Sequence, residues 1–244
     1  MKKIRYTAHR AMTTLLALFL FQQVIGQSAG LGTANIFNLT YNFTPKWSAS
    51  FEPQFRSDKF YSNFNFEEYK ISVNYNVANR LAILLGTGIH NTYSYGGNFK
   101  QPFVSKERRL WEQFSLYNTI GRLKLEHRYR IEQRWGTQGY RNRFRYRLNA
   151  ILSLNQPKIN TGALYAYVND EIYLTDKPGY FQRNRFYVGL GYRLIKQLTI
   201  QTGYVHQFDY TANRKSAKNF LQTSFLINVH SHRSLRELQP ATSE

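Results

Sequence analysis

The sequence has 244 residues, a formal net charge of +19 at pH 7, an aromatic content of 16% and no cysteine. The lack of cysteine excludes disulfides, thiol catalysis and cysteine-based zinc sites. No run of 18 or more apolar residues occurs, so no transmembrane helix is expected. A charge this basic is common among proteins that bind polyanions, so the placement of the arginines decides the functional class.

The N-terminal 26 residues have the pattern of an export signal. A positive segment is followed by an apolar run at 11–21 and by a small residue, Gly26, at a plausible cleavage site. The positive residues are Lys2, Lys3, Arg5 and Arg10. The alternative, a buried first helix of a cytosolic protein, is disfavoured because no later segment is helical enough to pack against it. Removal of residues 1–26 takes away four positive charges, so the net charge falls from +19 to +15. Because the protein is expected to be exported, nucleic acid is not an expected partner.

From residue 31 onward, apolar and polar residues alternate over ten to fourteen positions at a time. Soluble strands usually have about 5–6 residues, whereas a tilted transmembrane strand needs about 9–11. The pattern therefore predicts an all-β, antiparallel, up-and-down transmembrane barrel over residues 27–230, followed by a polar tail at 231–244. The predicted strands are 31–43, 47–56, 66–77, 81–93, 108–119, 123–135, 140–154, 160–173, 183–195, 198–210 and 219–230.

These segments number eleven, but bacterial single-chain barrels have an even number of strands. We therefore expect twelve strands, with a further short one in 27–35, or ten if the first segment is not a full strand. The connections are expected to alternate between short turns and longer polar loops, as in outer-membrane barrels. The expected short turns are 44–46, 78–80, 120–122, 155–158 and 196–197, and the expected loops lie near 57–65, 94–107, 136–140, 174–182 and 211–218.

The arginines at every second position of 140–149 are predicted to face the lumen. Phe144, Tyr146 and Leu148 occupy the opposite face, which would contact lipid, where an arginine costs about 2–4 kcal/mol at the membrane midplane. The same parity extends the charged face to neighbouring strands. The predicted luminal charge cluster is Lys124, Glu126, Arg128, Arg130, Glu132, Arg134, Arg141, Arg143, Arg145, Arg147, Glu171, Arg185 and Arg193.

Other residues share the predicted luminal face. Glu52 and Glu68 are further candidate partners for the arginines, whereas the strand around Glu112 is ambiguous. Luminal tyrosines can hydrogen-bond or stack on guanidinium groups, and luminal glycines leave room for long side chains. These tyrosines and glycines are Tyr165, Tyr167, Tyr187, Gly86, Gly88, Gly189, Gly191 and Gly203. The favoured interpretation is a salt-bridged filling of a narrow lumen, and the alternative is an anion-attracting pore or ligand site.

The sequence offers little for catalysis. No G-x-S-x-G, H-E-x-x-H or P-loop motif occurs. His90, with Ser94 nearby, is the best local pair of base and nucleophile, although a polar strand end explains it equally well. His127 and His206 fall on the lipid-facing side. His230 and His232 could bind a metal adventitiously, but a solvated tail is the favoured interpretation. No catalytic residue, metal site or cofactor is therefore predicted.

Five blocks of the sequence resemble an uncharacterised family of outer-membrane barrels common in Bacteroidetes-type bacteria, domain of unknown function 2490. They are RLWEQFSLYNTIGRLKLEHRYRIEQRW, RNRFRYRL, VNDEIYL, QRNRFYVGLGYRL and GYVHQFD, within a resemblance that covers about 31–230. The resemblance implies a barrel in the bacterial outer membrane and no established activity. Members usually end on an aromatic residue near the last strand, whereas this chain continues through 231–244.

The expected function is therefore that of a non-enzymatic outer-membrane barrel, either structural or forming a narrow pathway for anions or other solutes. Expected partners are outer-membrane lipid and lipopolysaccharide, the barrel-assembly machinery and, if the lumen admits them, small anions. The alternatives are an enzyme acting on lipid or lipopolysaccharide, and a barrel that binds lipopolysaccharide or a partner through basic loops. The basic residues of those loops are Lys100, Lys106, Arg108, Arg214, Lys215 and Lys218.

Overall fold

The computed structural model describes residues 30–231, apart from 95, 97, 101, 138, 212 and 213. The predicted signal peptide lies outside this part of the chain, as does all of the predicted tail except Ser231. The strands are β1 (Leu31–Asn42), β2 (Trp47–Lys59), β3 (Ser62–Ala78), β4 (Leu81–Tyr93), β5 (Phe103–Ile120), β6 (Leu123–Gly136), β7 (Gly139–Ser153), β8 (Leu164–Thr175), β9 (Phe181–Arg193), β10 (Leu198–Thr211) and β11 (Arg214–His230). Within these residues, none forms a helix that is long and apolar enough to cross a membrane.

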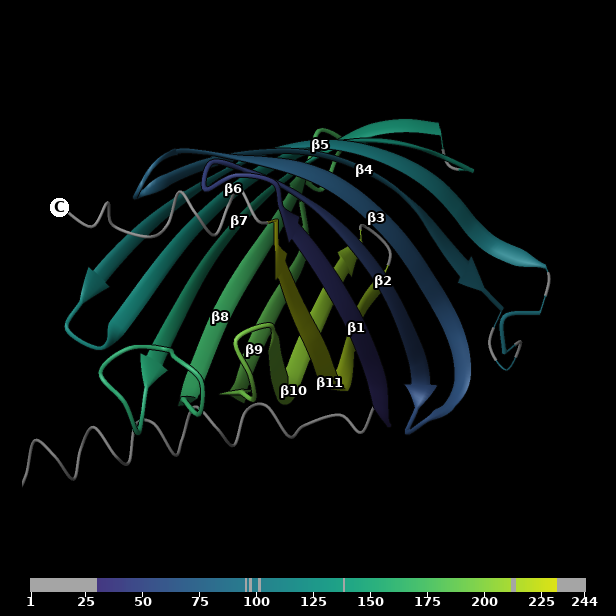
Figure 1. Cartoon of the computed structure of the whole chain (residues 1–244). Helices are drawn as coiled ribbons and strands as arrows, with labels where there is room; N and C mark the ends of the chain where they lie inside the picture. Colours follow the sequence, from purple (N-terminus) through teal and green to yellow (C-terminus); the bar gives the residue numbers. More distant parts are fainter. Residues whose placement is uncertain are drawn as a thin grey trace, which may run out of the picture.

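The strands form one closed barrel, which confirms the predicted all-β barrel fold (Figure 1). Each strand is antiparallel to the next, but the barrel closes through a parallel pair, β1 with β11, in register from Leu31↔Asn219 to Asn42↔His230. The expected count of twelve is wrong for the described chain, which has eleven strands. The even-number rule presupposes an antiparallel closing pair, but a parallel closing pair also satisfies the hydrogen bonds of the two edge strands.

The barrel has two rims. At the hairpin rim, each even-numbered strand turns into the following odd-numbered strand, as at β2–β3 and β4–β5. At the turn rim, each odd-numbered strand turns into the following even-numbered strand, as at β1–β2 and β7–β8. In Figure 1 the hairpin rim, with the β4–β5 connection, lies at the right, and the turn rim lies at the left.

The predicted alternation of short turns and long loops is wrong. The segment expected as a loop near 57–65 is mostly strand, since only Phe60 and Tyr61 separate β2 from β3. The expected tight turn at 155–158 is part of a wider connection, 154–163. Where a strand continues past the apolar band, polar residues occupy both of its faces and the sequence resembles a loop. The prediction therefore ends such strands too early.

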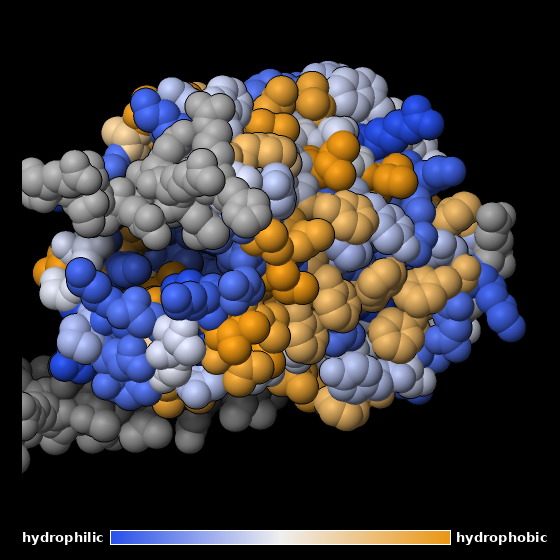
Figure 2. Space-filling view, in the orientation of Figure 1, coloured by the Kyte–Doolittle hydropathy of each residue, from blue (hydrophilic) through white to orange (hydrophobic). Residues whose placement is uncertain are grey.

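The two faces of the wall have opposite character. On β3, Ile71 and Val73 point outward and are 56% and 47% exposed, whereas Lys70 and Ser72 line the interior. Figure 2 shows hydrophobic side chains spread over the outer face of β1, β2 and β3, with hydrophilic residues around a hollow at the turn rim. The two-residue period of the strands therefore separates an apolar exterior from a polar interior.

An aromatic cluster fills part of the interior. The rings of Tyr167 and Tyr187 stack with centroids 4.4 Å apart, and Tyr165 packs against Tyr167 at 6.2 Å. Val205 and Phe220 join the same buried cluster. These tyrosines lie on the interior face, as predicted, but they pack on one another instead of on the arginines.

Gly86 is required because the Trp111 indole lies flat against it across the β4–β5 pair. A Cβ atom at position 86 would clash with the indole, which is only 3% exposed. We expect Gly86→Ala to lower the free energy of unfolding by about 1–3 kcal/mol through overpacking, measured by urea titration of the folded barrel. In a Trp111→Leu background the same substitution should cost less than half as much. An equal cost in both backgrounds would show that the indole is not the obstacle.

Candidate functional site

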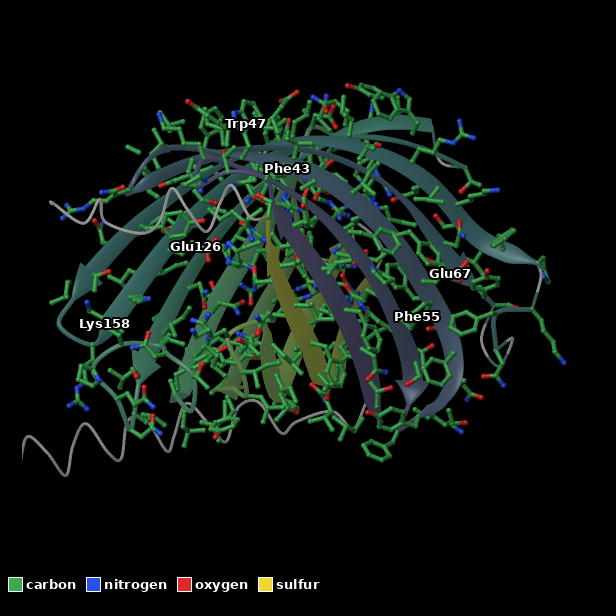
Figure 3. All side chains as sticks on the ribbon, in the orientation of Figure 1. Phe43, Trp47, Phe55, Glu67, Glu126 and Lys158 are labelled. Atoms are coloured by element: carbon green, nitrogen blue, oxygen red, sulfur yellow. The ribbon has the colours of Figure 1, made fainter. Side chains whose placement is uncertain are left out.

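The interior contains a cavity of about 660 Å³ to which every strand contributes lining residues. Its basic lining residues are Arg56, Lys70, Arg109, Arg128, Arg130, Arg134, Arg141, Arg143, Arg145, Arg147, Arg183, Arg185 and Lys218. Its acidic lining residues are Glu52, Asp58, Glu68, Glu107, Glu132, Glu171 and Asp209. Thirteen cations against seven acids leave an excess of six positive charges, 13 − 7, around the cavity. Figure 3 shows nitrogen and oxygen atoms gathered between the strands inside the barrel.

The cavity is elongated along β2 and β11, whereas on β7, β8 and β9 its lining is restricted to 141–147, 169–173 and 182–187, in the half next to the hairpin rim. On β2 its lining extends from Ser50, near the turn rim, to Asp58, next to the hairpin rim. On β11 it extends from Lys218 to Leu226. The polar space is therefore elongated along the barrel and not confined to one end.

Ten of the thirteen residues of the predicted charge cluster line this cavity; the exceptions are Lys124, Glu126 and Arg193. Lys124 is exposed near the turn rim, and Glu126 forms an ion pair with Arg147 at 3.0 Å. Arg193 donates to the backbone carbonyls of Ile159 (2.9 Å) and Lys196 (2.8 Å), so it binds the turn-rim connections instead of the cluster.

The register of β6 and β7 brings the predicted arginines together. Arg128 lies opposite Arg147, Arg130 opposite Arg145 and Arg134 opposite Arg141, all on the inward face. Like charges in directly opposed positions repel, so the pairs need carboxylates from other positions.

Three buried glutamates supply most of that compensation. Glu107 on β5 binds Arg109 (2.6 Å), Arg134 and Arg141 (2.5 Å). Glu132 and Glu171 are both bound by Arg145, which joins β6 to β8 through β7. Each of these acids is at most 6% exposed, so each neutralises charge inside the wall and not in water.

Several arginines are hydrogen-bonded mainly by glutamine, which is uncharged. Arg130 donates twice to Gln113 Oε1, at 2.9 and 2.6 Å, and Arg143 donates to Gln182 Oε1 at 2.6 Å. Arg185 likewise donates to Gln207. The acid nearest to Arg130 and Arg143 is Glu132, at 3.7 and 3.9 Å, and Arg145 already binds it. An amide carbonyl satisfies a guanidinium donor without neutralising its charge, so these arginines carry much of the positive excess.

Tyr173 lies at the centre of a group of arginines and is 2% exposed. The guanidinium carbons of Arg145 and Arg143 lie 4.5 and 5.4 Å from its ring centroid, and those of Arg183 and Arg185 lie 5.6 and 5.8 Å away. Its hydroxyl donates to Glu171 (2.8 Å) and accepts from Arg145 (3.1 Å). Sequence analysis missed Tyr173, although it follows Glu171 by two residues and so shares its face.

Buried donors in the cavity wall lack acceptors in the described protein. They include Nε and Nη1 of Arg134 and the Nε atoms of Arg128, Arg147 and Arg185. Buried donors of this kind are normally satisfied, so each of these atoms requires a further acceptor, such as water or an anion.

The prediction from the sequence missed or misplaced further residues. Arg109 lies on β5, whose pattern is ambiguous, and Lys218, expected in an external loop, lines the cavity and pairs with Asp58 at 3.0 Å. Glu112 points outward and is exposed, between Leu85 and Ile131 of the neighbouring strands.

The histidines are placed as follows. His90 is 4% exposed, and its Nδ1 lies 2.8 Å from Glu68 Oε2; no hydrogen bond in the described chain joins it to Ser94 or another serine. His127 and His206 point outward and bond Tyr146 (2.9 Å) and Asn219 (2.8 Å). The described residues contain no group of three or more His, Cys, Asp or Glu side chains that could hold a metal ion.

The fold and its interior define a closed β-barrel with a basic lumen. A family model described as "Protein of unknown function (DUF2490)" matches residues 32–218, and the chain belongs to that family. No curated protein matches the sequence. Among solved structures, LpxR from Salmonella typhimurium is similar, with a TM-score of 0.44 and 9% identity over 75% of this chain and 84% of that chain.

Proposed function

We propose that the protein is an integral barrel of the bacterial outer membrane whose lumen binds small anions and forms a narrow pathway for them. The observation that carries this proposal is the excess of six positive charges around a cavity that runs along the barrel. A low-dielectric wall concentrates the field of such charges, which raises the local concentration of anions.

The outer face supports a membrane location. Leu39, Ile71 and Leu85 are 44%, 56% and 54% exposed on one continuous side of the wall. A monomeric soluble protein rarely exposes a large continuous apolar patch, whereas lipid is a suitable solvent for one.

Aromatic pairs flank the apolar band towards both rims. Trp47 and Tyr75 lie 4.6 Å apart near the turn rim, and Trp135 and Tyr140 lie 5.5 Å apart near the hairpin rim. Figure 3 labels Trp47 towards one rim, and Phe55 and Glu67 towards the other. Two girdles of aromatic residues are typical of outer-membrane barrels.

The anion pathway is tested by single-channel conductance of the folded protein in a planar bilayer. We expect a small, steady, anion-selective current. Replacing two glutamine-paired arginines, Arg143→Gln and Arg185→Gln, should lower the anion selectivity several-fold because it removes charge while keeping an amide donor. Arg108→Gln on the outer face is the matched control and should leave selectivity unchanged. A folded barrel without current, or with a current indifferent to the luminal pair, would contradict the pathway.

A further inference from the structure

The wall between β3 and β4 carries a buried acid–imidazole pair that the charge balance of the lumen does not explain. Glu68 and His90 are register partners, and both side chains point inward. They are 5% and 4% exposed, with His90 Nδ1 2.8 Å from Glu68 Oε2. The second imidazole nitrogen, Nε2, is buried and has no hydrogen-bond partner in the described protein, although His90 lines the cavity.

The hydrogen bonds define what Nε2 offers. A carboxylate only accepts, so His90 Nδ1 must carry the proton that faces Glu68. Lys70 Nζ lies 2.8 Å from Glu68 Oε1 but also binds Glu52, so this cation does not decide the charge of His90. The imidazole is only 4% exposed, and burial away from water disfavours its charged form. The imidazole is therefore neutral, and its Nε2 is a hydrogen-bond acceptor.

The carboxylates in this part of the lumen are bound by cations, whereas His90 Nε2 is a neutral acceptor without a partner in the described protein. Across the β4–β5 pair, His90 lies opposite Glu107, and the Arg109, Arg134 and Arg141 guanidinium groups all bind that acid. Arg134 retains two buried nitrogens without a protein acceptor. The same region thus presents donors suited to an anionic oxygen and one buried acceptor suited to an O–H group.

We propose that the lumen binds an anion that also carries hydroxyl groups, a phosphorylated sugar. The arginines beside Glu107 hold its phosphate, and a sugar hydroxyl donates to His90 Nε2. Glu68 fixes the tautomer and orientation of the imidazole. A cavity of about 660 Å³ is within the usual range for small-molecule sites and accommodates a phosphorylated monosaccharide. This inference rests on the proposed anion-binding lumen and specifies its ligand.

The test compares two phosphate monoesters of equal charge, glucose 6-phosphate and methyl phosphate, by calorimetric titration of the folded protein in detergent. We expect the sugar ester to bind about tenfold more tightly, which corresponds to about 1.4 kcal/mol. His90→Asn retains an amide nitrogen in the place of Nδ1 for Glu68 but has no counterpart of Nε2. This variant should bind both esters with the weaker affinity. His206→Asn on the outer face is the matched control and should keep the preference.

Equal affinity for the two esters in the unaltered protein would overturn the inference while leaving an anion-binding lumen in place. So would a sugar preference that survives in His90→Asn. Binding of neither ester by a folded barrel would refute the anion-binding lumen itself. Because conduction is measured separately, a barrel that binds the sugar ester without passing current would contradict only the pathway.

Discussion

Replacing Glu171 by glutamine is expected to lower the free energy of unfolding by about 3–5 kcal/mol, the usual cost of leaving a buried charge without its partner. Glu171 is 4% exposed, binds Arg128 and Arg145 and accepts from the Tyr173 hydroxyl at 2.8 Å. Glutamine keeps the volume but leaves the two guanidinium groups facing a neutral amide. Urea titration of the barrel folded into lipid vesicles, followed by its gel mobility, measures the loss.

The neighbouring residue provides the control for this prediction. Asp170 points outward and accepts one hydrogen bond, from Asn184 at 2.8 Å. Asp170→Asn removes the same charge from the same strand, and we expect it to change the free energy of unfolding by less than about 1 kcal/mol. Equal losses for the two variants would mean that the luminal ion pairs do not stabilise the barrel specifically.

The second large effect concerns the outer face. Val73 lies opposite Ala49 and Leu85 in the middle of the apolar band and is 47% exposed. If lipid covers this band, Val73→Arg should cost about 2–4 kcal/mol in vesicles, as arginine does near the midplane of a bilayer. On a water-exposed surface the same substitution would change stability by about 0.5 kcal/mol or less.

The adjacent position separates the membrane effect from a general intolerance of arginine. Asn74 belongs to the inward face near the turn rim, where its amide donates to Asn76 at 3.1 Å. Asn74→Arg should cost less than about 1 kcal/mol, measured by the same titration. A barrel in which Val73→Arg is as well tolerated as Asn74→Arg would not be lipid-facing at this position.

The sequence predicts the barrel because its signal is repeated in most of the strands. The alternation of apolar and polar residues locates most strand ends at the turn rim to within one residue, as at Trp47, Leu81, Leu123 and Leu198. At the hairpin rim the prediction falls short, and β5 begins at Phe103 instead of 108. There the strand extends beyond the apolar band, so neither face is apolar and the alternation disappears.

The site was only partly predictable for a different reason. Parity assigns a side chain to the lumen, so it finds the arginines of β6 and β7, but it contains no information about which carboxylate reaches which guanidinium. Glu107 and Arg109 are missed because β5 carries charged residues on both faces, Glu112 among them. The pairing of His90 with Glu68 depends on the β3–β4 register, which sequence parity does not determine.

Because the number of strands is odd, the first strand begins and the last strand ends at opposite rims of the barrel. β1 begins with Leu31 at the hairpin rim, and β11 ends with His230 at the turn rim. If the barrel spans a membrane as proposed, the start of β1 and the end of β11 face opposite compartments, whereas in an even-stranded barrel they face the same one. In such a membrane, a short epitope joined before β1 and another joined after β11 would be cut by proteases added from opposite sides, and assembly would require one of these two strand ends to cross the bilayer.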